Sequence, residues 1–223
     1  MRKTLLAAIL LAVLSAAAAF AFNPDELSTI TFQNSTGTKI QMIFLSPADS
    51  EYWGPDIIGA DYVLKDGGSI GYYVHFPHEA TTFDVMATDD KGNKFEMRDF
   101  KVIAGKQQTI TLTRKSLNRT APDFTLATLA VENDTGHELQ YLFISPADSE
   151  TWGADLLDEE RTLADGDSHS IVIPMGTDKV QYNLMATDEN DDEYIFNVTI
   201  NPAKGKEFTV AIDASDLQQS GGE

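Results

Sequence analysis

Residues 46–56 read Ser-Pro-Ala-Asp-Ser-Glu-Tyr-Trp-Gly-Pro-Asp, and residues 145–155 read Ser-Pro-Ala-Asp-Ser-Glu-Thr-Trp-Gly-Ala-Asp. The two stretches lie 99 residues apart (145 minus 46), and nearly the same offset relates the sequence on either side of them. The chain is therefore predicted to use one module twice, over residues 27–113 and 126–217. Residues 114–125 are predicted to form the linker.

The repeated stretch predicts a short helix in a loop. Ser46 suits a helix N-cap, Pro47 suits the first helical position, and Asp49 lies three residues after the cap. Gly54 is expected to stop the helix in a left-handed conformation. The indole of Trp53 is expected either to fill the end of a core or to form a face for a ligand.

The rest of each module predicts strands. Short runs of alternating apolar and polar residues are separated by turn signals about every ten residues, which is typical of an antiparallel sandwich. Asn34-Ser35-Thr36-Gly37 and its counterpart Asn133-Asp134-Thr135-Gly136 favour a tight turn with positive φ. The predicted fold class is all-β: two tandem antiparallel β-sandwich modules, Ig-like or C2-like, each with one short helix in a loop.

The N-terminal residues predict an exported chain. Arg2 and Lys3 precede the apolar run 4–18, and Ala19-Phe20-Ala21 matches a leader-peptidase site. Residues 1–21 are thus expected to be a signal peptide, and no later apolar run is long enough to cross a bilayer. Because the chain has no cysteine, we expect a periplasmic or secreted bacterial protein that is stabilised by packing alone.

The charge is strongly acidic and unevenly shared. The whole chain has 16 Lys and Arg against 35 Asp and Glu, for a formal net charge of −19. Residues 27–117 hold nine basic and eleven acidic residues, whereas residues 126–217 hold four and twenty. Such a field repels phosphate backbones, so nucleic acid is not an expected partner.

Residues 218–223 are predicted to form a flexible tail.

Loop carboxylates that both modules share suggest a Ca²⁺ site, because this ion takes six to eight oxygens from flexible loops. If the short helix and the hairpin tip lie at one end of the sandwich, three carboxylates of each module would converge on one ion. Helix capping and turn formation are the alternative roles for these side chains. The candidate ligands are Asp49, Asp56 and Asp89 in the first module and Asp148, Asp155 and Asp188 in the second.

Aromatic residues of the repeated stretch are the candidates for a ligand face, namely Tyr52, Trp53 and Trp152. The sequence has no phosphate-binding loop, dinucleotide fingerprint or nucleophile elbow, so an enzyme is not expected. The predicted function is an exported non-catalytic binding module that engages a protein or glycan through the helix-loop end. A structural envelope spacer or assembly protein is the alternative, and a carboxylate-based hydrolase is a weaker one.

The order of these motifs also resembles a known pattern. Asn-x-Thr-Gly, an aromatic-rich strand, Ser-Pro and Trp-Gly-x-Asp follow one another in residues 27–90 and again in residues 126–189. This order resembles an uncharacterised family of small exported bacterial β-domains, although the present chain lacks cysteines. The resemblance implies an exported β-domain and carries no established activity.

Overall fold

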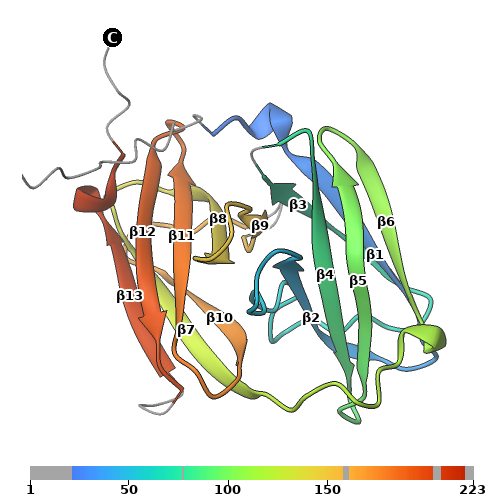
Figure 1. Cartoon of the computed structure of the whole chain (residues 1–223). Helices are drawn as coiled ribbons and strands as arrows, with labels where there is room; N and C mark the ends of the chain where they lie inside the picture. The colour runs from blue at the N-terminus through green and yellow to red at the C-terminus, as the bar shows by residue number, and fades with distance from the viewer. Residues whose placement is uncertain (1–21, 77, 158–160, 203–206, 219–223) are drawn as a thin grey trace, which may run out of the picture.

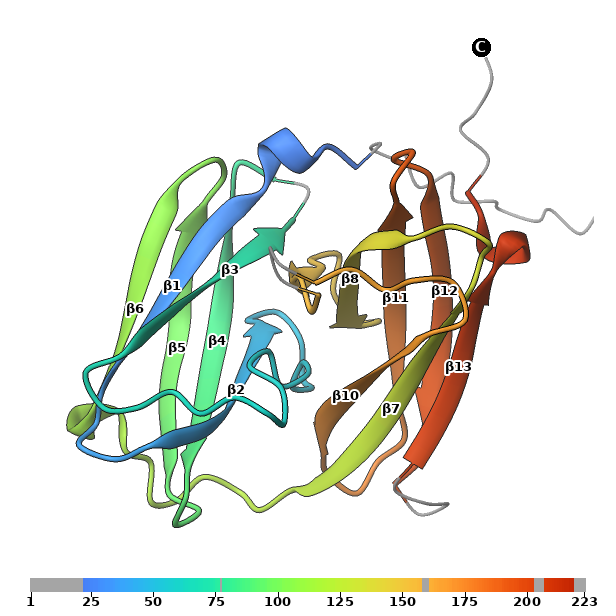
Figure 2. The same ribbon diagram turned by 180° about the vertical axis from the view of Figure 1, so that it is seen from behind.

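The computed structural model describes residues 22–76, 78–157, 161–202 and 207–218, which are mostly β-strand (Figures 1 and 2). The predicted signal peptide, residues 1–21, lies outside the described residues, as does the end of the predicted tail. Within the described ranges, no helix has the length and apolar character of a membrane span.

Six strands of the first half form a sandwich of two sheets, in the orders β6-β1-β3 and β2-β4-β5. All neighbours are antiparallel except β1 and β6, which are parallel. Phe32 and Phe83 are completely buried in the core. The elements are η1 (Pro24–Glu26), β1 (Ser28–Ser35), β2 (Ile40–Pro47), β3 (Ser69–His75), β4 (Ala80–Asp89), β5 (Lys94–Ile103), β6 (Gln107–Thr113) and η2 (Arg114–Ser116).

The second half has the same arrangement, with sheet orders β13-β7-β10 and β8-β11-β12, so the all-β sandwich prediction is confirmed. Strands β7 and β13 are its parallel pair. The elements are β7 (Thr125–Asp134), β8 (Leu139–Pro146), β9 (Gly153–Ala154), β10 (Ser168–Met175), β11 (Val180–Asp188), β12 (Glu193–Ile200), β13 (Glu207–Asp213) and η3 (Ala214–Asp216).

The Asn-x-Thr-Gly turns are organised by a buried asparagine. Asn34 accepts hydrogen bonds from the backbone and hydroxyl of Thr36, and its amide donates to the carbonyl of Leu64 (2.9 Å). The side chain therefore ties the turn to a distant loop. Gly37 and Gly136 have φ angles of 81° and 82°, as the sequence predicted.

The predicted short helix is wrong. Ser46 and Pro47 are the last residues of β2, and turns follow them. The Ser46 hydroxyl donates to the carbonyl of Tyr52 (2.6 Å) instead of capping a helix. Gly54 is required for close packing, because a Cβ at this position would lie 2.1 Å from the carbonyl oxygen of Leu45.

The two halves pack against each other through a nearly two-fold set of contacts. The backbone nitrogen of Asp56 donates to the carbonyl of Val172 (2.8 Å), and that of Asp155 donates to the carbonyl of Tyr73 (2.9 Å). Both donors and both acceptors differ by 99 residues, so each half makes the same contact to the other. This reciprocity is the pattern of a symmetric dimer interface, here within one chain.

Proline explains why only one of these contacts becomes a strand. Strand β9 extends the sheet of the first half, where Gly153 pairs with His75 at the end of β3. The residue that matches His75 in the second half is Pro174, which has no backbone N–H to donate. The chain at Gly54 therefore lies beside β10 without forming a strand.

Candidate ligand-binding site

The repeated stretch lies at the junction of the halves. Asp148 accepts hydrogen bonds from the Ser50 hydroxyl (2.7 Å) and from the Glu51 backbone nitrogen (3.1 Å). In return, Asp49 accepts from the Ser149 hydroxyl (2.8 Å). Two predicted metal ligands thus fasten the halves together.

A second pair of predicted ligands is buried beneath the junction. Asp56 accepts from the backbone nitrogens of Ile43 (2.9 Å) and Ile58 (3.3 Å), and Asp155 accepts from that of Leu142 (3.1 Å). Burial raises the pKa of Asp56 to about 7, although its backbone hydrogen bonds oppose the shift. These carboxylates fix the path of the repeated stretch.

The third pair lies at the opposite end of each sandwich, so the predicted metal trios do not form. Asp89 pairs with Ile40 at the start of β2, whereas Asp49 follows Pro47 at its end. Seven steps along a strand separate these positions by more than about 20 Å. Asp188 is placed in the same way in the second half.

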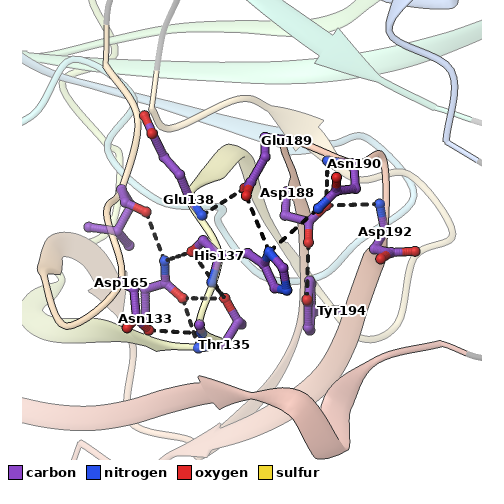
Figure 3. Close-up of polar contacts among 12 residues, drawn as sticks. Asn133, Thr135, His137, Glu138, Asp165, Asp188, Glu189, Asn190, Asp192 and Tyr194 are labelled. Atoms are coloured by element: carbon purple, nitrogen blue, oxygen red, sulfur yellow. Dashed lines mark hydrogen bonds and ion pairs between the residues drawn. The ribbon is translucent and has the colours of Figure 1, made fainter.

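Asp188 instead forms a group with Glu189, the next residue of the β11–β12 turn, and with His137 of the β7–β8 turn (Figure 3). Ligand atoms of His137, Asp188 and Glu189 all lie within 4.8 Å of one another. The imidazole Nδ1 of His137 lies 3.2 Å from Glu189 Oε1, and this contact raises the pKa of His137. Sequence reasoning did not select His137, because the first half has threonine at the matching position.

The carboxylate of Asp188 already has hydrogen-bond donors. It accepts from the backbone nitrogens of Asn190 (2.8 Å) and Asp192 (3.1 Å) and from the Tyr194 hydroxyl (3.2 Å). These contacts give it a structural role in the turn, which is the alternative that the sequence left open. Binding of Ca²⁺ by this group stays a prediction.

The turns at the far ends of the two sandwiches carry opposite charge. Segments 35–39, 89–93 and 113–119 hold five Lys and Arg and two Asp and Glu, for a net of +3. The matching segments 134–138, 188–192 and 213–218 hold eight Asp and Glu and no Lys or Arg, for a net of −8. In both ribbon views, the β4–β5 tip and the β11–β12 tip lie at opposite ends of the molecule (Figures 1 and 2).

A pocket of about 300 Å³ opens where the repeated stretch of the first half meets the second half. Tyr52 and Trp53, two of the predicted ligand-face residues, line it. The pocket also includes residues that sequence reasoning did not place on a ligand face, and docking of the halves adds those of the linker and the second half to those of the first. These are Glu51, Met86, Glu96, Pro122, Asp123, Phe124, Pro174, Gly176, Thr177, Asp178, Val180 and Tyr182.

The pocket is acidic, with four carboxylates and no Lys or Arg in its lining. Glu96 pairs with Arg98 (3.2 Å), and Asp123 pairs with Lys94 (3.0 Å). Glu51 of the first half and Asp178 of the second half also line the pocket. Among the described residues, neither forms an ion pair with a Lys, Arg or His. Two negative charges of the pocket are thus uncompensated.

Trp53 is half-buried and held at the edge of the pocket. The guanidinium of Arg98 lies 4.6 Å from the centre of the indole, which is a cation–π contact. The Tyr182 hydroxyl donates to the backbone carbonyl of Trp53 (3.1 Å). The indole of Trp53 therefore already has one cationic partner, the guanidinium of Arg98.

Trp152 has a different environment, although it occupies the matching position. It packs against a cluster of Phe22, Phe143 and Met185 and does not line the pocket. The three candidates for a ligand face are thus divided: Tyr52 and Trp53 line the junction pocket, and Trp152 supports packing.

Comparison with known proteins gives no assignment. No family model matches the chain, and no curated protein matches it. Among solved structures, it is similar to a protein from Eubacterium rectale determined by NMR, with 16% identity over 42% of this chain and 90% of that one, and a TM-score of 0.30. It is also similar to the fibronectin(III)-like modules of Clostridium thermocellum CbhA, with 9% identity over 86% and 94% and a TM-score of 0.18.

Proposed function

We propose that this chain is an exported, non-catalytic binding protein of two tandem modules, and that the junction pocket takes a positively charged group of a protein partner. The uncompensated carboxylates of Glu51 and Asp178 carry this proposal. They supply charge for a Lys or Arg side chain, while Trp53 and Tyr52 supply aromatic faces.

The experiment uses the tryptophans as reporters. The chain has two, so Trp152→Phe leaves Trp53 as the single fluorophore, and Trp53→Phe leaves Trp152 as the control. Titration with a tetra-arginine peptide should change the emission of the Trp152→Phe chain and leave that of the Trp53→Phe chain unchanged. Tetra-glutamate should give no response.

The carboxylates provide the second arm of the test. Glu51→Gln and Asp178→Asn should each weaken binding of the peptide by up to about fivefold, since an exposed ion pair contributes about 1 kcal/mol at most. Equal binding by wild type and both variants would contradict the proposal. A response to a neutral oligosaccharide, without one to the peptide, would favour a glycan ligand instead.

A further inference from the structure

Phe22 joins the two halves at the N-terminal end of the described chain. Its ring lies 5.3 Å from His75 in the first half and 5.0 Å and 5.8 Å from Tyr141 and Phe143 in the second, between ring centres. Only 6% of the residue is exposed. A residue next to a predicted cleavage site is thus part of the folded structure.

The backbone nitrogen of Phe22 lies against a carboxylate. It donates to Glu193 Oε1 at 2.5 Å. In the part of the chain that the structure describes, no Lys, Arg or His forms an ion pair with Glu193. A hydrogen bond between two charged groups is roughly twice as strong as one between neutral groups, so an ammonium at this nitrogen would suit Glu193 better than a peptide N–H.

The matching place in the first half has the opposite charge. Phe124 packs on Phe44, 99 residues before Phe143, with ring centres 5.5 Å apart. Lys94 occupies the position that matches Glu193, and its ammonium contacts the carbonyl oxygen of Pro122 (2.5 Å). The segment within the chain thus meets a cation, which contacts its carbonyl oxygen at Pro122 and its carboxylate at Asp123, whereas the segment that follows the predicted leader meets an anion.

We propose that hydrolysis of the Ala21–Phe22 peptide bond is a maturation step that creates a structural ion pair between the new α-ammonium of Phe22 and Glu193. A leader peptidase supplies the catalytic groups, and water adds across the bond. The carboxylate then stays on Ala21, and the amine of Phe22 takes up a proton, because α-amino groups have pKa values of about 7.7 to 8.0.

This inference rests on the export that forms part of the proposed function, and adds a role for the mature N-terminus. Sequencing of the protein exported by a bacterial host should give Phe22 as the first residue. Any other first residue would overturn the inference. Binding of a basic peptide at the junction pocket is measured separately, so failure of one proposal is distinguishable from failure of the other.

A double-mutant cycle tests the ion pair. Chains that begin at Phe22 or one residue earlier at Ala21 are each prepared with Glu193 and with Glu193→Gln. The extension should lower the thermal midpoint by about 3 to 6 °C with Glu193 present. It should have little effect in the Glu193→Gln chain, where the charge pair is already lost.

Two controls separate charge from bulk. Acetylation of the chain that begins at Phe22 removes the charge with little added volume, and should reproduce the effect of the extension. Lys94→Gln should leave the effect of the extension intact, because Lys94 contacts Pro122 instead. The proposed ion pair would be overturned if the extension lowered the thermal midpoint equally with Glu193 and with Glu193→Gln, or if it did not lower the midpoint at all.

Discussion

Asp56 couples the stability of the junction to pH. The residue is 5% exposed, and its Oδ2 atom has no hydrogen-bond partner among the described residues. Burial disfavours the charged form and raises the pKa from 3.8 to about 7. Because the pKa is higher in the folded state than in the unfolded state, Asp56 contributes most to the free energy of unfolding when it is protonated. This contribution is complete below about pH 4 and is lost as pH rises through 7.

Substitution of this residue should flatten the pH profile. Between pH 5 and 8, the wild type should lose about 2 to 3 kcal/mol of unfolding free energy relative to Asp56→Asn, which cannot ionise. Urea denaturation at several pH values measures the difference. Asp49→Asn, which leaves the buried Asp56 in place, is the control and should show the same loss between pH 5 and 8 as the wild type, whatever its overall stability. Parallel profiles for Asp56→Asn and wild type would contradict the assignment.

The turns of the repeated stretch hold the halves together with unequal contributions. Asp148 accepts two hydrogen bonds from the other half, whereas Asp49 accepts one. Asp148→Ala should therefore lower the unfolding free energy by about 1 to 2 kcal/mol and Asp49→Ala by about half as much. Urea titrations of the two variants provide the comparison, and equal losses would show that these contacts do not decide the stability of the junction.

Local patterns predicted the elements that depend on local chemistry. The Asn34 turn formed as expected, because its polar partners and its glycine lie within a few residues. The Ser46 helix did not, because Tyr52 offers a carbonyl to the hydroxyl and β2 continues through Pro47. The capping pattern alone shows neither the carbonyl of Tyr52 nor the continuation of β2.

The candidate site was predictable only in part, since it depends on how the halves dock. Tyr52 and Trp53 were identified because the stretch recurs in the sequence. Phe124 and Asp178 line the same pocket from the predicted linker and from the second half, and no periodicity relates them to it. The metal trios failed for the same reason: sequence spacing does not specify which end of a sandwich a loop occupies.

The whole molecule should unfold in one step. The reciprocal backbone contacts, the β3–β9 pairing and the Phe22 cluster all cross the junction, so loss of one half removes partners of the other. Calorimetry should give a single transition with a ratio of calorimetric to van't Hoff enthalpy near one. Two separate transitions in the wild type would contradict this coupling.

The charges at the far turns give the molecule a large electric dipole. With a net of +3 in the turns at one end and −8 in those at the other, the long-range field is that of an oriented body and not of a uniformly acidic sphere. A cationic surface would attract the β11–β12 end first and turn the β4–β5 end outward. The orientation of the chain on approach is therefore set before any close contact forms, and salt would weaken it over a Debye length of about 10 Å at 0.1 M.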